Sequence, residues 1–347
     1  MSLRLDYRSY SLPLLRPLRT AHGLCTVREG GVVRLVDESG AVGLGEVCPL
    51  PGFNRERWSD SESVLGRLGE HVTWETLADL PSDLECLCGA LAAARRMLEG
   101  GRGDGDRGAP DQPATPPPAW PVASLLPAGK AALGEVDSRL ELGFRIFKWK
   151  VGVAPVGDEI ALLDDLLGRM PEGARLRLDA NGAWGRRQAE RWLERCAERP
   201  IEHVEQPVDA ERKGAEDLLL GLADDYPTPL ALDESLVLGA DITTWLEKGW
   251  QGVFVVKPSL LADPEAILGR LERAGAKVVF SSALETAIGA RNALDIAFSW
   301  GGERRALGFG VWPLFGGLHV NGPHAAPFMQ LADVRRLDPQ KTWTVLN

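Results

Sequence analysis

Five ionisable residues follow one another along the middle of the chain at nearly regular intervals. Each stands at the end of a short apolar run that is typical of a β-strand, and together they are Lys150, Asp179, Glu205, Asp233 and Lys257. Successive members are 29, 26, 28 and 24 residues apart. One β/α unit has about this length when roughly 250 residues are shared among eight units. Any one of the five could be a strand-end cap or a surface charge, but their regular spacing favours equivalent positions on neighbouring strands.

The three carboxylates and the two lysines have complementary chemistry. Asp179, Glu205 and Asp233 would supply hard oxygen ligands, which suit Mg²⁺ because it takes a few carboxylates and keeps positions for water or substrate oxygens. Zinc is not indicated, because no Cys or His joins the set. With a divalent cation at the centre and Lys150 and Lys257 on either side, the site could hold an anionic, small-molecule carboxylate substrate.

A second lysine, Lys148, precedes Lys150 by two residues in the run FKWKVG, so both side chains share one face of a strand. Lysines of an edge strand in water are the simpler interpretation. If the face points into the mouth of a barrel, Lys148 and burial would lower the pKa of Lys150, whereas the carboxylates would raise it. The same period places Arg177 and Asn181 with Asp179. Arg177 then either braces the metal carboxylates from the layer below or is an ordinary polar residue of the barrel interior.

The runs that carry these residues belong to a regular alternation of strands and helices. From Pro121 onward, short apolar runs alternate with amphipathic helical runs such as residues 186–197 and 264–274. The eight predicted strands are VASLL, FRIFKWK, ARLRLDA, IEHVEQ, PLALDE, GVFVVKP, KVVFSS and RALGF. Such alternation predicts an α/β protein, and eight strands favour a closed TIM-like barrel over an open doubly wound sheet. The strand ends then form the C-terminal rim, where barrel enzymes place their catalytic residues.

The chain divides into four parts by composition and pattern. Residues 1–100 contain β-rich runs followed by helical runs and predict an α+β capping domain. Residues 101–120 are rich in Gly and Pro and predict a mobile loop. The predicted barrel takes residues 121–318. Residues 319–347 lack the pattern of a barrel helix and are expected to return to the cap.

Composition argues against several other classes of protein. With 347 residues, 44% hydrophobic and 25% charged, the chain has the make-up of an ordinary globular protein, and no apolar run approaches the ~18 residues of a membrane span. A net charge of -10 argues against nonspecific nucleic-acid binding, which depends on Lys and Arg. The start, MSLRLDYRSY, lacks the apolar core of a secretion signal, so a cytoplasmic location is expected. No feature of the sequence predicts an oligomeric state.

The strand-end residues resemble those of the enolase superfamily, in the lysine-base branch that includes muconate lactonizing enzyme. The resemblance covers most of the chain and rests on the motifs KWK, LDANG, EHVEQP, LDES and VVKP. A narrower resemblance, to the o-succinylbenzoate synthase family, rests on LRTAHG, GEVCPLPGF, FSSALETAIG and GFGVWPLF.

This resemblance implies a (β/α)7β barrel under a capping domain formed by both chain ends, with Mg²⁺, or Mn²⁺ as a substitute, held by Asp179, Glu205 and Asp233. It implies syn dehydration of 2-succinyl-6-hydroxy-2,4-cyclohexadiene-1-carboxylate to o-succinylbenzoate, a step toward menaquinone or phylloquinone. Lys150 would remove the proton α to the carboxylate and then protonate the departing hydroxyl. Lys257 would stay protonated and face the enediolate.

The segments of the narrower resemblance make Ser281, Ser282, Gly308 and His22 candidate substrate-binding residues. Two alternatives stay open at this point. An N-succinylamino acid racemase, or another epimerase of the superfamily, would use the same two lysines on opposite faces of its substrate. A noncatalytic metal-binding relative would have no reason to keep both lysines beside three carboxylates.

Overall fold

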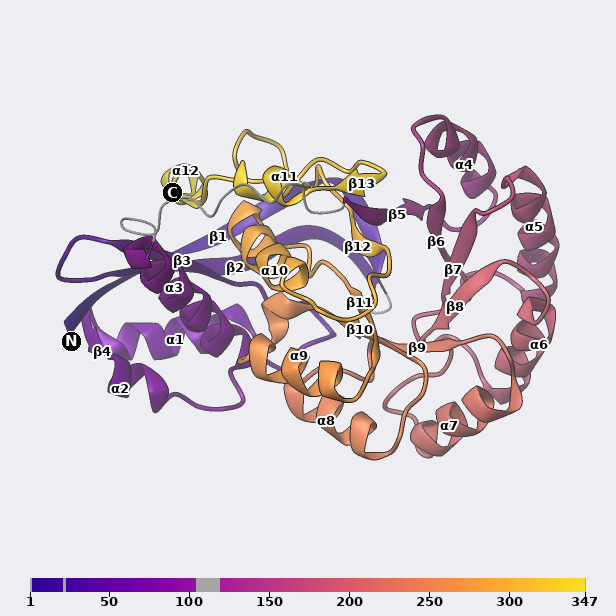
Figure 1. Cartoon of the computed structure of the whole chain (residues 1–347), viewed down its shortest axis with the longest axis horizontal. Coiled ribbons are helices and arrows are strands. Elements are labelled where there is room, and N and C mark those ends of the chain that lie inside the picture. The colour runs from indigo at the N-terminus through magenta and orange to yellow at the C-terminus, as the bar shows by residue number, and fades with distance from the viewer. Residues whose placement is uncertain (1, 21–22, 104–118, 347) are drawn as a thin grey trace.

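The computed structural model describes residues 2–20, 23–103 and 119–346, which form an antiparallel sheet with its helices beside a barrel (Figure 1). The predicted substrate contact His22 lies outside the described residues. So does most of the predicted loop 101–120.

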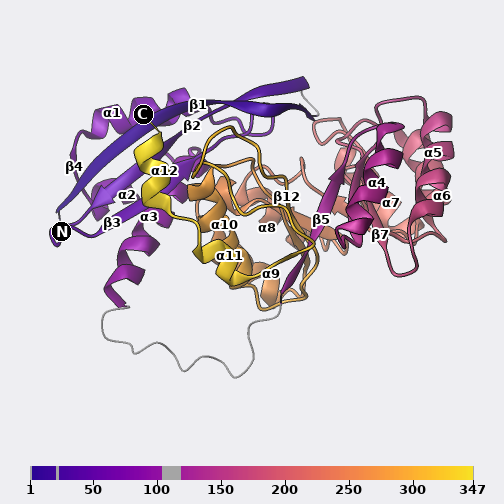
Figure 2. The same ribbon diagram turned by 90° about the horizontal axis from the view of Figure 1, so that it is seen from above.

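Four antiparallel strands form the sheet of the cap, in the order β3–β2–β1–β4. They are β1 (Ser2–Thr20), β2 (Gly23–Val36), β3 (Val42–Val47) and β4 (His71–Thr73). The helices of the cap are α1 (Trp58–Leu68), α2 (Trp74–Ala78) and α3 (Glu85–Gly103). β1 and β2 extend from the cap toward the barrel (Figure 2), where the amide of Leu15 donates to the carbonyl of Leu314.

Helix α3 lies so close to β3 that two positions of the strand have no room for a side chain. A Cβ at Gly45 would overlap the carbonyl oxygen of Ala90, and one at Gly43 would overlap that of Ala94. Both obstacles are backbone atoms, which cannot swing aside as a flexible side chain can. The two glycines of VGLGEV therefore set the distance between helix and sheet.

Eight parallel strands of the described chain form the barrel, each hydrogen-bonded to the next. They are β5 (Trp120–Leu126), β6 (Ile146–Lys150), β7 (Arg175–Asp179), β8 (Ile201–Glu205), β9 (Leu230–Leu232), β10 (Val253–Val256), β11 (Lys277–Phe280) and β12 (Leu307–Gly310). β12 pairs with β5, and a single bridge between Ser281 and Gly308 joins β11 to β12. The predicted (β/α)7β barrel is confirmed.

Helices follow the first seven strands of the barrel. They are α4 (Ala131–Glu141), α5 (Val156–Arg169), α6 (Arg186–Cys196), α7 (Ala215–Asp225), α8 (Gly239–Glu247), the 3₁₀ turn η1 (Pro258–Leu260) with α9 (Pro264–Arg273), and α10 (Ala287–Phe298). α9 shows why they form where they do. The side chain of Asp263 accepts from the amide of Ala266 and caps the helix, and Pro264 occupies its first turn. The buried Ile267 and Leu271 then face the barrel core.

Strand β6 shows how the barrel separates apolar from charged side chains. Phe147 and Trp149 are fully buried, and the ring of Trp149 packs edge-on against Trp192 of α6 at 6.4 Å between ring centroids. Lys148 and Lys150 alternate with them and therefore point to the barrel interior. The aromatic residues anchor the strand to its helix layer, which leaves the other face for the two lysines.

The C-terminal segment runs back to the cap. It contains β13 (Phe328–Met329), which pairs with β5, followed by α11 (Leu331–Arg335) and α12 (Pro339–Val345). The guanidinium of Arg8 in β1 stacks 4.4 Å from the centre of the Trp343 ring and donates to the carbonyls of Trp343 and Leu346. The exact boundaries of the four predicted parts of the chain stay predictions.

Within residues 2–20, 23–103 and 119–346, no helix combines the length and the apolar composition that crossing a membrane requires.

The close contact between α3 and β3 can be tested by adding one methyl group. We expect Gly45→Ala to lower the free energy of unfolding by about 2–3 kcal/mol, because backbone atoms must move to admit the new Cβ. Gly134→Ala in α4 is the matched control, since a Cβ there meets open space and Ala favours the helix by roughly 0.5–1 kcal/mol. Urea unfolding of both variants measures the difference. Equal effects of the two substitutions would contradict the packing argument.

Candidate active site

The five predicted strand-end residues lie at the same end of five neighbouring strands. Lys150, Asp179 and Glu205 are the last residues of β6, β7 and β8, and the strand register places Lys150 opposite Asp179 and Asp179 opposite Glu205. Asp233 follows β9 directly, and Lys257 follows β10. The structure thus brings all five onto the C-terminal rim of the barrel.

The ammonium of Lys148 bridges two of the three predicted metal ligands. Its Nζ lies 2.9 Å from Oδ2 of Asp179 and 2.7 Å from Oε1 of Glu205. Burial lowers the pKa of Lys148, but the charges of the two carboxylates outweigh burial and hold this pKa above its ordinary value. Burial likewise raises the pKa of Glu205, but the Lys148 charge and the contact with His203 together outweigh burial and hold that pKa well below its usual range. Both groups are therefore charged.

Lys257 stands on the other side of the carboxylates. Its ammonium pairs with Oδ1 of Asp233 and lies 4.2 Å from the centre of the Phe53 ring, which comes from the cap. Burial lowers the pKa of Lys257 to about 7, while the nearby charge of Glu205 opposes this shift. The ion pair with the Asp233 carboxylate favours the charged form of Lys257 and so opposes the effect of burial.

Glu234, next to Asp233, also lies in the site although the sequence did not single it out. Its Oε1 accepts from the side-chain amide of Asn181 at 2.9 Å. Burial, followed by the charge of Asp179, raises the pKa of Glu234 to about 7. Oε2 of Glu234 and Oδ1 of Asn181 are buried and have no hydrogen-bond partner among the described residues. Strand alternation would have placed Glu234 opposite to Asp233, but β9 ends at Leu232 and the rule no longer applies.

The rim residues have the chemistry of a magnesium site, although their present positions do not form one. In the described part of the chain, no three His, Cys, Asp or Glu side chains converge closely enough to hold a metal ion. Instead Lys148 pairs with Asp179 and Glu205, and Lys257 pairs with Asp233. Hard carboxylate oxygens on adjacent strands, with buried acceptor oxygens nearby, fit Mg²⁺. The three metal ligands stay a prediction.

Arg177 lies below the rim and is almost fully buried. Its Nε and one terminal nitrogen donate to the two carboxylate oxygens of Glu202 at 2.9 and 3.0 Å, and the other nitrogen donates to the carbonyl of Ala306. No contact to Asp179 or Glu205 is among these bonds. They fit the second interpretation given above, an ordinary polar residue of the barrel interior.

Gln206 fixes the position of Asp233, a role that the sequence did not suggest. Its Oε1 accepts from the amides of Asp233 and Ser235, and its Nε2 donates to the hydroxyl of Ser235. The backbone of Gln206 has a φ of 37°, a left-handed conformation that is uncommon outside glycine. The side chain therefore ties the loop after β8 to the loop after β9.

The predicted substrate contacts differ in where they lie. Ser281 follows β11, and Gly308 bridges to it in β12; a Cβ at Gly308 would lie 2.9 Å from Oγ of Ser281. The hydroxyl of Ser282 is used within its own loop, since it donates to Glu285 and accepts from the amide of Leu284. Ser281 and Gly308 therefore lie together at the rim, whereas Ser282 braces the loop. Their substrate contacts stay predictions.

A cavity of about 420 Å³ adjoins the rim between the cap and helices α7 and α8. Phe53 and Arg55 of the cap line it, together with Glu234 and Ser235 of the loop after β9 and Trp245 of α8. Small-molecule sites have volumes of roughly 300–1,000 Å³. The cavity approaches the lysines and carboxylates through Phe53 and Glu234, so it provides space beside the charged groups.

A barrel with three carboxylates between two lysines on its rim defines an enzyme of the enolase class. The model of the family described as Enolase C-terminal domain-like matches residues 132–322, which span the barrel from α4 to beyond β12. The resemblance seen in the strand-end motifs is confirmed.

Comparison with individual proteins narrows this class. An o-succinylbenzoate synthase from Thermosynechococcus vestitus is 40% identical over 314 residues, which cover 89% of this chain and 92% of that protein. The crystal structure of o-succinylbenzoate synthase from Thermosynechococcus elongatus BP-1, complexed with Mg in the active site, matches with a TM-score of 0.78 and 38% identity, covering 96% of this chain and 98% of that one. An L-Ala-D/L-Glu epimerase from Bacillus subtilis is 26% identical over 86% of this chain and 85% of its own length. The chain belongs to the o-succinylbenzoate synthase family of the enolase superfamily.

Glu285, in the loop after β11, links folding to pH. Burial raises its pKa to about 7 from an ordinary value of 4.5, so between these pH values the folded chain holds a proton that the unfolded chain releases. Stability therefore falls as the pH rises through this window and stays reduced above it. We expect Glu285→Gln to raise the free energy of unfolding by about 3 kcal/mol at pH 8 and to change it little at pH 4.5.

Urea unfolding at the two pH values tests this expectation. The exposed Glu29, as Glu29→Gln, is the control and should change stability little at either pH. An equal effect of Glu285→Gln at both pH values would show that no proton is linked to folding at this residue.

Proposed function

We propose that this chain dehydrates 2-succinyl-6-hydroxy-2,4-cyclohexadiene-1-carboxylate to o-succinylbenzoate, toward menaquinone or phylloquinone. The observation that carries the proposal is its 40% identity, over nearly the full length of both chains, to an o-succinylbenzoate synthase. The rim of lysines and carboxylates supports it, because the reaction removes a proton next to a carboxylate. Identity to the epimerase of Bacillus subtilis is only 26%.

The proposed cofactor is Mg²⁺, which the solved relative from Thermosynechococcus elongatus holds in its active site. Asp179, Glu205 and Asp233 would hold the ion, and Mn²⁺ would be a substitute. When bound, the ion supplies fixed positive charge to the substrate carboxylate, as is established for the superfamily. Asn181 and Glu234 would support the ligands from beside them, through their mutual hydrogen bond.

The proposed roles of the lysines follow from the charge that develops during the reaction. Lys150 takes the proton from the carbon next to the carboxylate, and the C–O bond of the neighbouring hydroxyl then breaks. Because Lys150 also returns its proton to the departing hydroxyl, water leaves from the face on which the proton was removed. Lys257 faces the enediolate from the opposite side as a cation. A fixed charge at that place stabilises the second negative charge as it forms.

Lys148 supports this chemistry without touching the substrate. Its ammonium neutralises part of the charge of Asp179 and Glu205, with which it forms largely buried ion pairs. The Lys148 ammonium, two residues away on the same face of β6, disfavours another positive charge at Lys150. We propose that Lys148 thereby keeps Lys150 closer to the neutral amine that a base requires.

We further propose that the enzyme acts in the cytoplasm. All five cysteines are free, and three of them, Cys48, Cys86 and Cys196, are buried. Free thiols are typical of reducing compartments, whereas secreted proteins tend to oxidise theirs to disulfides.

Racemisation or epimerisation of N-succinyl amino acids is the second candidate function. The observation that favours it is the position of Lys150 and Lys257 on two sides of the carboxylates, which suits proton exchange on both faces of one carbon. Exchange of the Cα proton for deuterium, lost separately in Lys150→Ala and Lys257→Ala, would identify this activity. Turnover of the cyclohexadiene substrate and of N-succinyl amino acids under the same conditions separates the two candidates.

The proposed base can be tested by removing its amine. We expect Lys150→Ala to lower turnover of the cyclohexadiene substrate by about 10²–10⁴-fold in the presence of Mg²⁺, the usual contribution of a positioned acid or base. Lys277→Ala is the matched control, because Lys277 begins β11 at the opposite end of the barrel. Circular dichroism and urea unfolding check that both variants fold. Undiminished turnover in Lys150→Ala would show that Lys150 is not the base.

The proposed metal site can be tested without relying on activity. We expect Mg²⁺ at 100 times its dissociation constant to raise the free energy of unfolding by about 2.7 kcal/mol, and Asp233→Asn to weaken this effect strongly. Asp225→Asn, an exposed carboxylate at the end of α7, should behave like the natural chain. Removal of divalent ions with EDTA should abolish turnover, and Mg²⁺ or Mn²⁺ should restore it. Stability that does not respond to Mg²⁺ in any variant would contradict the site.

A further inference from the structure

Three adjacent strands of the cap sheet each contribute one buried polar side chain to a hydrogen-bond network that reaches the barrel loop after β11. Tyr10 comes from β1, Arg28 from β2 and Glu46 from β3, and they are 7%, 0% and 2% exposed. None of the three belongs to the rim of lysines and carboxylates. Buried polar groups are costly unless they are fully hydrogen-bonded, so their partners show what they hold together.

Arg28 is bonded to four backbone carbonyls, two on each side of the boundary between cap and barrel. Its terminal nitrogens donate to Cys48 and Pro49 of the cap at 2.9 Å each, and its guanidinium also donates to Ala283 and Leu284 of the barrel at 3.3 Å. No carboxylate of the described residues forms an ion pair with it. Only the planar fork of arginine presents donors in enough directions to reach both pairs.

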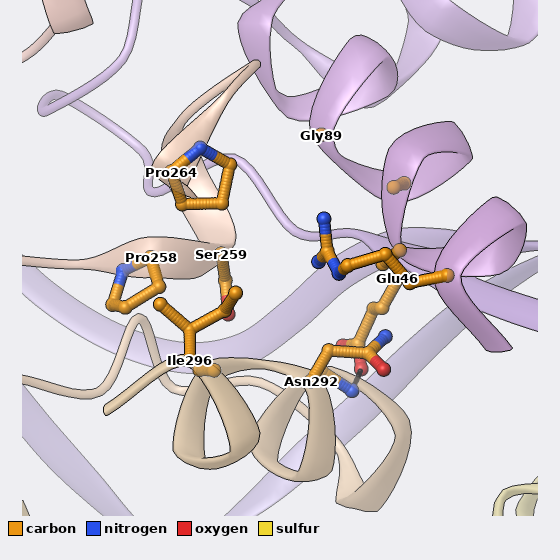
Figure 3. A pocket seen from close by; sticks show the side chains of 12 residues that line it. Glu46, Gly89, Pro258, Ser259, Pro264, Asn292 and Ile296 are labelled. Carbon is orange, nitrogen blue, oxygen red and sulfur yellow. Dashed lines mark hydrogen bonds between the residues drawn. The ribbon is translucent and has the colours of Figure 1, made fainter. Parts of the chain in front are cut away.

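The carboxylate of Glu46 binds backbone amides at the end of the same barrel loop and in the first turn of α10. The carboxylate accepts from the amide and hydroxyl of Thr286 and from the amide of Gly289, at the N-terminus of α10. The hydroxyl of Tyr10 donates to it at 2.6 Å, and a Cβ at Gly30 would lie 2.5 Å from that hydroxyl. Figure 3 shows Glu46 reaching from the cap to the helix that carries Asn292. A negative charge is favourable at a helix N-terminus, so this contact holds the start of α10 against the cap.

The two segments that Arg28 joins both flank Lys257. On the barrel side, Ser281 stands beside Lys257, because the preceding residues Val256 and Phe280 are paired in register. On the cap side, the segment that starts at Cys48 continues to Phe53, whose ring covers the Lys257 ammonium.

The barrel loop is also strained where Arg28 holds it. Leu284 has a φ of 60°, a left-handed conformation that costs free energy in a residue other than glycine. Its carbonyl accepts from Arg28, and its amide donates to Ser282. Such a conformation persists only where the surroundings enforce it, so these bonds fix the path of the loop beside Lys257.

We infer that Arg28 is a positioning residue for the reaction. It joins residues 48–53 of the cap to residues 281–286 of the barrel, and thereby keeps Phe53 and Ser281 in place on the two sides of Lys257. Loss of the guanidinium leaves the cap able to move away from the rim, so substrate would meet a site that is assembled for only part of the time. Apparent affinity falls in proportion to that fraction.

Arg34 provides a matched comparison on the same strand. It is partly buried, donates to Asp6 at 3.1 Å and lies 5.8 Å from the centre of the Trp343 ring. Arg34 shares a face of β2 with Arg28 but lies six residues farther along the strand, and its partners are Asp6 of β1 and Trp343 of α12. None of these partners belongs to residues 48–53 or 281–286. A substitution of Arg34 therefore perturbs the cap without releasing those segments.

Steady-state kinetics of Arg28→Met and Arg34→Met with the cyclohexadiene substrate and Mg²⁺ test the inference. We expect Arg28→Met to raise KM by about tenfold or more and to lower kcat by a smaller factor, whereas Arg34→Met keeps KM within roughly twofold. Arg28→Lys keeps the charge but lacks the fork, so it should raise KM in the same direction and replaces Arg28→Met if that variant does not fold. An unchanged KM in the folded Arg28 variant would overturn the inference.

Hydrogen exchange of backbone amides tests the same inference independently of activity. We expect exchange in peptides that cover residues 48–53 and 281–289 to become about tenfold faster in the Arg28 variant and to stay unchanged in Arg34→Met. Equal exchange in both variants would overturn the inference. The kinetic test rests on the proposed function: if the natural chain does not dehydrate the substrate, that function fails, while the exchange measurement still decides the role of Arg28.

Discussion

The balance between buried lysines and buried carboxylates at the barrel rim is the constraint on which the rest of the structure depends. Lys148 lies between Asp179 and Glu205, and Lys257 pairs with Asp233. Neither the cations nor the anions could be buried alone, because an unpaired charge away from water is strongly destabilising. Each set is tolerated only where the other stands within a few ångströms, and only a defined strand register provides that arrangement.

Strand register in turn depends on features that carry no charge. Phe147 and Trp149 fasten β6 to its helices, which directs the lysines of that strand inward. Gln206 holds the loop that sets Asp233, and the cap places an aromatic ring over Lys257. The charged rim is thus held by apolar anchors on its outer side, by amide hydrogen bonds between its loops and by the cap above it.

Features that follow from local periodicity, such as strands and their ends, were predicted well from the sequence. Contacts between side chains that lie far apart along the chain were predicted poorly. The ends of five strands were predicted correctly, because the ionisable residues there are spaced by the length of one β/α unit. The predicted barrel is confirmed. The partner of Arg177 was not foreseen, because the register between β7 and β8 shifts next to this residue, and no local pattern encodes such a shift. Glu234 was not predicted as a site residue, because β9 ends at Leu232 and strand alternation does not apply to the residues that follow it. Arg28 and Glu46 act on residues more than 200 positions away, which periodicity cannot reveal.

The contact of Arg8 with Trp343 has a consequence for synthesis of the chain. These residues are 335 positions apart, so the first strand of the cap emerges long before the helix that covers it. At a rate of about 5–20 residues per second, the interval is roughly 20–70 s. During that time the face of β1 that carries Arg8 lacks the cover of α12 while the barrel is made. The contact between Arg8 and Trp343 can therefore form only after all the strands of the barrel have been synthesised.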